Sequence, residues 1–122
     1  MTLELPPGFQ VKRVYETPDP DDGTRVLIDR LWPRGLTKQQ ARIDRWPKAL
    51  TPSTELRRWF HADPDAHRAE FVRRYRAELA APEVQKDLLE LRTLADEHAV
   101  TLLTAVKDPE NSHVPVLLGL LR

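Results

Sequence analysis

Two short polar segments, each following an apolar run, hold the residues best suited to chemistry. One is residues 32–35, Trp-Pro-Arg-Gly, and the other is residues 107–113, Lys-Asp-Pro-Glu-Asn-Ser-His. Arg34 stands between a proline, which fixes the local backbone, and Gly35, which lets a partner approach the main chain closely. Lys107 supplies a second cation. These residue types predict a binding site for a phosphate or a carboxylate.

Three groups near those cations could transfer protons: Asp29, Asp108 and His113. We predict His113 in the first turn of a helix that starts after Ser112, where free N–H groups and the helix dipole favour an anion. Asp29 interrupts an apolar run that we expect to be a buried strand, where an ionised side chain is costly unless it is paired. The three groups are therefore the candidate catalytic residues, and the most specific hypothesis is that the site hydrolyses its ligand.

The same residues also allow a purely structural interpretation. Arg34 could pair with Asp29 or Asp108, Asp29 could instead accept a loop N–H, and Ser112 could serve only as a helix cap. The sequence leaves both interpretations open, so whether the chain is an enzyme stays undecided at this stage.

The segment from His61 to His67, His-Ala-Asp-Pro-Asp-Ala-His, has the composition of a metal site. Asp63 directly precedes Pro64, however, which predicts that its carboxylate caps a helix. His61 would then end the preceding helix, and we retain it as a ligand-binding residue that faces the pocket. The chain has no cysteine, which excludes thiol catalysis and thiolate zinc sites. We predict no metal site and no cofactor, and we expect His67 and His98 at the surface.

A second hypothesis, from another class of function, rests on an arginine-rich helix around residues 68–76. The arginines are Arg68, Arg73, Arg74 and Arg76. They could contact a nucleic-acid backbone or a partner protein in a non-catalytic accessory domain. Glutamates at positions 70 and 78 interleave with them, so a solvated face with salt bridges explains the pattern as well. Nineteen basic and nineteen acidic side chains cancel, which argues against attraction of nucleic acid to the whole surface.

The three tryptophans, Trp32, Trp46 and Trp59, are too far apart to form a helical stripe. We expect them in the core or in pocket walls rather than as a platform for stacking bases. A tryptophan-rich surface that pairs two copies of the chain is a third hypothesis.

The elements that position these residues follow from hydrophobic periodicity and from helix start signals. Strands are predicted at residues 9–15, 25–32 and 99–106. Helices are predicted to begin at Pro52, Pro64 and Pro82, with a short helix at 38–44 and a final one at 113–121. Thr37 and Gln40 have the spacing of a capping box for the short helix.

Strands separated by helices favour parallel pairing. The predicted fold class is therefore α/β, a small and mostly parallel sheet with helices packed around it in a single domain. Ligands of such sheets bind beyond the carboxyl ends of the strands, where both polar segments lie.

The length of 122 residues fits one domain, which we place at residues 9–122 after an N-terminal tail at residues 1–8. No apolar run approaches the ~20 residues of a membrane span, and the first residues do not resemble a secretory signal. We therefore expect a cytoplasmic protein without a membrane partner, whose ligand is a phosphorylated or carboxylate small molecule.

Several motifs together resemble a known family. They are residues 25–35, Trp46, residues 52–61, Phe71, Tyr75, Glu78-Leu79, residues 101–103 and Lys107-Asp108. In order and spacing, from about residue 11 to the C-terminus, they are similar to the YeaO-like branch of domain-of-unknown-function family 488. The resemblance implies a stand-alone bacterial domain, and it supports the domain boundaries and motif positions rather than a mechanism.

One position departs from the family pattern. Family members carry Asn-His-aliphatic where this chain has Ser112-His113-Val114, followed by Pro115. Serine and asparagine are interchangeable as helix caps but seldom as catalytic amides. The departure therefore favours a capping role for Ser112, while His113 keeps its place.

Overall fold

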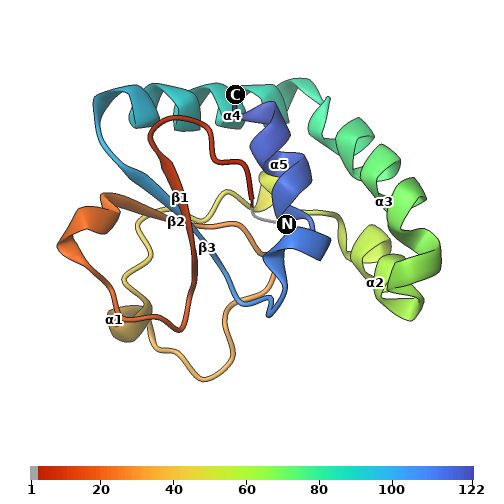
Figure 1. Cartoon of the computed structure of the whole chain (residues 1–122), viewed down its shortest axis with the longest axis horizontal. Coiled ribbons are helices and arrows are strands. Elements are labelled where there is room, and N and C mark those ends of the chain that lie inside the picture. Colours follow the sequence, from red (N-terminus) through yellow and green to blue (C-terminus); the bar gives the residue numbers. More distant parts are fainter. Residues whose placement is uncertain (1–2) are drawn as a thin grey trace.

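Three parallel strands form the sheet in the computed structural model, which describes residues 3–122 (Figure 1). The strands are β1 (Phe9–Arg13), β2 (Thr24–Leu27) and β3 (Val100–Thr104). The sheet order is β1-β3-β2, so the last strand in sequence lies between the first two. Every residue of β3 is buried, as expected of a central strand covered on both faces. The α/β class and the parallel pairing predicted from sequence are confirmed.

The strands are shorter than predicted, and the difference matters most at β2. This strand ends at Leu27, so Asp29 and Arg30 follow the sheet rather than interrupting a strand, and the prediction of 25–32 was wrong at its end. Ile28 still donates its N–H to the Leu103 carbonyl at 3.0 Å. Its own carbonyl turns to the His113 Nε2 atom at 2.7 Å, which ends the ladder.

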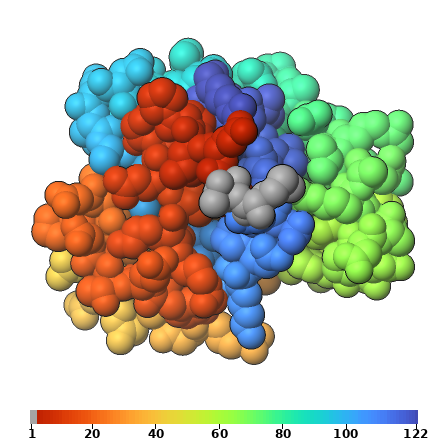
Figure 2. Space-filling view, viewed as in Figure 1, coloured from red at the N-terminus to blue at the C-terminus, as the bar shows by residue number. Residues whose placement is uncertain are grey.

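The five α-helices are α1 (Lys38–Ala41), α2 (Thr54–Ala62), α3 (Pro64–Leu79), α4 (Pro82–Glu97) and α5 (Val114–Leu120). Helix α4 runs along one end of the sheet, α2 and α3 lie together to one side, and α5 lies between the sheet and α3 (Figure 1). Figure 2 shows the C-terminal residues, in blue, between the N-terminal third, in red and orange, and helices α2 and α3, in green.

Helix ends follow the local capping chemistry. The Thr37 and Gln40 capping box is confirmed, with each side chain accepting the backbone N–H of the other residue. Asp63 caps α3 by accepting the N–H of Ala66 at 3.4 Å, also as predicted. The predicted start of α2 at Pro52 was wrong by two residues. Ser53 is the cap there, because its hydroxyl accepts the N–H of Leu56.

The main core lies between the sheet and helices α2 to α5. Aromatic rings of α2 and α3 run through it, with Phe60 stacked on Phe71 at 4.2 Å between centroids and Phe71 beside Tyr75. The buried Tyr75 hydroxyl donates to the Leu50 carbonyl, and burial raises the pKa of the phenol far above its usual value. Within residues 3–122 no helix is long and apolar enough to cross a membrane.

A separate cluster of buried charge stands on the side of the sheet that faces α1. Asp22 and Arg25, with only 2% and 4% of their surfaces exposed, form an ion pair, and Lys12 reaches the same carboxylate at 3.0 Å. The Arg25 guanidinium also donates to the carbonyls of Ala41 and Arg42 at 2.9 and 3.1 Å. Each charge in this cluster therefore has a partner, as burial requires.

Candidate functional site

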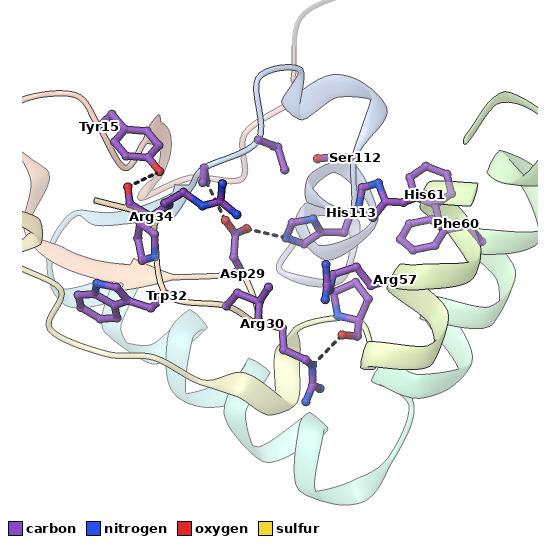
Figure 3. Close-up of a pocket in the computed structure, with 16 residues that line it drawn as sticks. Tyr15, Asp29, Arg30, Trp32, Arg34, Arg57, Phe60, His61, Ser112 and His113 are labelled. Atoms are coloured by element: carbon purple, nitrogen blue, oxygen red, sulfur yellow. Dashed lines mark hydrogen bonds and ion pairs between the residues drawn. The ribbon is translucent and has the colours of Figure 1, made fainter. Parts of the chain in front are cut away.

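A pocket of about 320 Å³ opens beyond the carboxyl ends of β2 and β3 (Figure 3). Its walls come from the segments after all three strands and from the helices beside them: Tyr15 after β1, residues 29–34 after β2, residues 105 and 106 after β3, Pro52, helices α2 and α3, and residues 112 and 113 before α5. This is the position that open parallel sheets offer to ligands, and the volume lies at the lower end of small-molecule sites.

Asp29 lies at the centre of the pocket in a fixed set of hydrogen bonds. Its carboxylate accepts the Thr104 hydroxyl and the Ala105 N–H, each at 2.7 Å, and its Oδ1 lies 3.4 Å from the His113 Nε2 atom. Burial acts to raise the pKa of Asp29, but the hydrogen bonds from His113, Ala105 and Thr104 outweigh it and hold the pKa below the ordinary value. The carboxylate is therefore ionised at neutral pH.

His113 links the two strand ends across the pocket. Its Nε2 atom lies 2.7 Å from the Ile28 carbonyl oxygen, which can only accept, so this nitrogen carries a proton. The ring also packs edge-on against Tyr75, with 6.2 Å between centroids. In the neutral ring, Nδ1 remains as a hydrogen-bond acceptor. The predicted neighbourhood of Asp29 and His113 is thus present in the structure.

Arg34 enters the pocket from the loop after β2. In Figure 3 it lies on the side opposite Arg57, with Asp29 and His113 between them. Its backbone carbonyl accepts the Tyr15 hydroxyl at 3.0 Å, which fastens this loop. Across residues 3–122 its guanidinium forms no ion pair, so the structural interpretation in which Arg34 pairs with Asp29 or Asp108 was wrong.

Arg57 is a second pocket arginine, and the sequence arguments missed it. It stands in the first turns of α2 and lines the pocket. Its Nε atom is buried without a hydrogen-bond partner among the described residues. The available signal was helical spacing, because Arg57 and His61 are four residues apart and share a face of α2.

His61 reaches the pocket from the last turn of α2, as predicted. Desolvation against the pocket wall, the charge of Arg57 and then that of His113 lower the pKa of His61 below its usual value. The ring is therefore neutral at neutral pH and offers both a donor and an acceptor.

Three of the predicted site residues lie outside the pocket. Lys107 and Asp108 are exposed and do not line it, and the Asp108 carboxylate accepts the Asn111 side-chain amide at 2.6 Å. A short 3-10 helix, Pro109–Asn111, follows these two residues. Gly35 also lies outside the lining; its φ of 82° explains the glycine, while a Cβ there would meet nothing within 4 Å.

Ser112 holds the start of α5 through its side chain, but the N-cap position is His113, which therefore precedes the helix instead of standing in its first turn as predicted. The Ser112 hydroxyl accepts the Val114 N–H at 3.1 Å and donates to the Pro109 carbonyl at 2.7 Å. Both contacts hold the start of α5, and they bring the adjacent His113 ring to the strand ends. The structure therefore unites Asp29, Arg34, His61 and His113 around one pocket.

The arginine-rich helix is largely occupied by contacts within the chain. Arg73 and Arg74 pair with Glu70, and Arg74 also covers the Trp59 ring at 4.2 Å. Arg68 donates to the Ser112 carbonyl at 2.6 Å. His67, expected at the surface, is half-buried because its ring stacks on the Trp59 ring, with 3.9 Å between the two centroids. These contacts fit the prediction of a salt-bridged face.

Among residues 3–122 no group of three His, Asp or Glu side chains could hold a metal ion. The pocket itself brings together three arginines, two histidines and one carboxylate. Such a set can bind an oxyanion through guanidinium groups and orient it with imidazole nitrogens.

Comparison with known proteins places this α/β domain in a family. Residues 8–122 match the family described as the inactive DUF488-N3 subclade. The uncharacterized protein YeaO of Escherichia coli is 42% identical over 115 residues, which cover 94% of this chain and 97% of that protein. An uncharacterized protein of Mycobacterium tuberculosis is 46% identical over 112 residues, 92% of each chain. No solved structure gives a significant match.

The structure thus defines a small α/β domain with a pocket beyond the ends of its parallel strands. The chain belongs to the DUF488 family, in the YeaO-like branch that its motifs predicted.

Proposed function

We propose that the pocket binds a small molecule through a phosphate or carboxylate group, and that the domain binds this molecule without hydrolysing it. The observation that carries the proposal is the pair of guanidinium groups, Arg34 and Arg57, that line one pocket without a carboxylate partner among the described residues. Arg57 is partly withdrawn from water, whereas Arg34 is exposed at the pocket edge. A guanidinium that is partly withdrawn from water is stabilised by an anion with matching geometry.

The nearby carboxylate does not neutralise these cations. Asp29 directs its oxygens at Thr104, Ala105 and His113, and the two arginines are not among its partners. Because the low pKa of Asp29 reflects those contacts, the group acts as a fixed part of the pocket wall. The positive charge of Arg34 and Arg57 is left for a ligand.

Two features favour binding over hydrolysis. The matching subclade is described as inactive. In addition, the candidate base Asp29 and the Nε2 proton of His113 are both engaged in contacts that join the strand ends. We assign these two residues to positioning the pocket, and Asp108 does not line it.

A ligand panel tests the proposal directly. Thermal unfolding is measured with inorganic phosphate, simple phosphate monoesters and carboxylates, for the natural sequence and for Arg57→Gln. A ligand present at ~100 times its dissociation constant adds ~2.7 kcal/mol to the free energy of unfolding. The neighbouring Arg58→Gln is the matched control, because Arg58 is exposed and does not line the pocket.

We expect stabilisation by at least one anion, its loss in Arg57→Gln and its retention in Arg58→Gln. A panel in which no anion stabilises the natural sequence would overturn the proposal. Equal stabilisation of both variants would also do so, because binding would then lie elsewhere.

The alternative is a non-catalytic accessory domain that binds nucleic acid or a protein through the arginine-rich helix of residues 68–76. Engagement of Arg68, Arg73 and Arg74 within the chain weighs against it. Binding to DNA or RNA at low salt, falling steeply as salt rises, would favour this alternative over the pocket.

A further inference from the structure

Some of the apolar side chains that line the pocket are exposed to solvent. Leu31 is 58% exposed and Tyr15 is 44% exposed, and both line the pocket. Among the described residues four large hydrophobic side chains are exposed, and two of the four line this pocket. An exposed apolar surface beside charged groups is typical of a binding site.

We propose that the natural ligand is a phosphate monoester with a flat apolar body about the size of one aromatic ring. This proposal rests on the proposed function, because it takes the pocket arginines to bind the anion. Arg57 and Arg34 bind the phosphate, and the ring lies against the apolar lining near Tyr15 and Leu31.

The size of the pocket argues for more than an inorganic anion. A volume of about 320 Å³ reaches the range of sites that enclose small organic molecules. Aromatic side chains form part of the wall, with Phe60 and Phe71 on the helical side and Tyr15 across the pocket. Aromatic walls favour a flat partner, since ring pairs prefer stacked or edge-on contacts.

The charge of the lining argues for a dianion. Arg30, Arg34 and Arg57 are cationic and Asp29 is the anion, which leaves an excess of two positive charges among these four residues. Arg30 donates to the Pro52 carbonyl at 2.9 Å, a contact that does not cancel its charge. A phosphate monoester carries close to two negative charges at neutral pH, whereas a carboxylate carries one.

The experiment measures dissociation constants by calorimetry for matched probes: phenyl phosphate, methyl phosphate, benzoate and benzyl alcohol. Phenyl phosphate is expected to bind roughly tenfold or more tightly than methyl phosphate, because the ring leaves water on binding. It is also expected to bind more tightly than benzoate, and benzyl alcohol is expected to show no binding.

Two exposed leucines provide the variant and its control. Leu31→Ser should weaken phenyl phosphate binding several-fold and leave methyl phosphate binding unchanged. Leu89→Ser is matched to it, because Leu89 has the same exposed fraction of 58% but lies on α4 and does not line the pocket. It should change neither constant.

The outcomes separate the two proposals. Equal binding of phenyl and methyl phosphate, or no effect of Leu31→Ser, overturns the apolar body while anion binding stands. Tighter binding of benzoate overturns the phosphate assignment in the same way. Absence of binding by every anion, or equal binding of benzyl alcohol, removes the proposed function as well.

Discussion

Two clusters of charge in this domain are built in opposite ways. In the buried cluster, Asp22 pairs with Arg25 and Lys12, and the remaining guanidinium nitrogens of Arg25 meet backbone carbonyls. In the pocket, the carboxylate of Asp29 is satisfied by neighbours other than the arginines, while Arg34 and Arg57 lack an anionic partner among residues 3–122. In the first cluster every charge has a partner within the chain, whereas in the second the two arginines have no anionic partner among the described residues.

A structural charge and a charge that serves a ligand differ in whether the chain itself supplies the partner. A buried charge that stabilises the fold has its partner in the chain, since isolation from water is otherwise costly. A charge held beside a cavity without such a partner contributes little to folding. Its removal should therefore affect binding rather than stability.

The largest expected effect comes from breaking the complete cluster. Asp22→Ala leaves Arg25 buried without its anion, and loss of one partner from a buried pair costs about 3–5 kcal/mol of unfolding free energy. Chemical denaturation measures this loss. Asp21→Ala in the same turn is the control, because Asp21 is exposed, and it should change stability by less than about 0.5 kcal/mol. Equal effects of the two variants would contradict the comparison.

A smaller effect is expected at Asp29, which shares features of both clusters. Asp29→Asn should cost about 1–3 kcal/mol at neutral pH, because charged hydrogen bonds to Thr104 and Ala105 are weakened. The folded state lowers the pKa of this carboxyl, so its contribution is present above the ordinary carboxyl pKa and is lost as pH falls through the lowered value.

The pH dependence provides the check on that variant. The difference in unfolding free energy between the natural sequence and Asp29→Asn should shrink as pH falls below about 4. A difference that stays constant down to strongly acidic pH would show that the ionised form of Asp29 does not contribute to stability.

The next smaller loss of unfolding free energy is expected at an exposed ion pair. Arg45 and Glu90 pair with side chains that are 44% and 47% exposed. Glu90→Gln should therefore cost no more than about 1 kcal/mol, and the cost should decline with added salt. Denaturation at low and high ionic strength measures it. A loss as large as that of Asp22→Ala would mean that burial does not govern the difference between charge clusters.

The smallest effect on stability is expected at Arg57. Arg57→Gln removes a cation without an anionic partner among the described residues, so unfolding free energy should change by no more than about 0.5 kcal/mol. The same variant should lose anion binding. A large loss of stability with intact binding would reverse the roles assigned to the two clusters.

The sequence predicted the sheet and its helices because their signals are local. Runs of consecutive apolar residues, prolines at helix starts and the Thr37 and Gln40 capping box depend on neighbours a few positions away. The ends of elements were less well predicted. The end of β2, for example, depends on His113, which takes the Ile28 carbonyl from 85 positions further along the chain.

The candidate site was predicted in part for the same reason. Strand ends and helix starts brought Asp29, Arg34 and His113 to one edge of the sheet, as expected of parallel strands. Lys107 also follows a strand end, but the pocket lining stops at Val106 and the Lys107 side chain is exposed. Arg57 was missed because the sequence of α2 indicates its apolar face, and only the packing of α2 against α3 shows where the neighbouring face points.

The central place of β3 also constrains how the protein can form during synthesis. Strands β1 and β2 do not pair with each other, and each finds its partner in β3, which is made some 70 residues after β2. The early strands therefore emerge from the ribosome without a sheet to join, while helices α2 to α4 can form from local contacts. The sheet and the pocket beyond its strands arise together, late in translation, so a nascent chain stopped before Val100 should have neither.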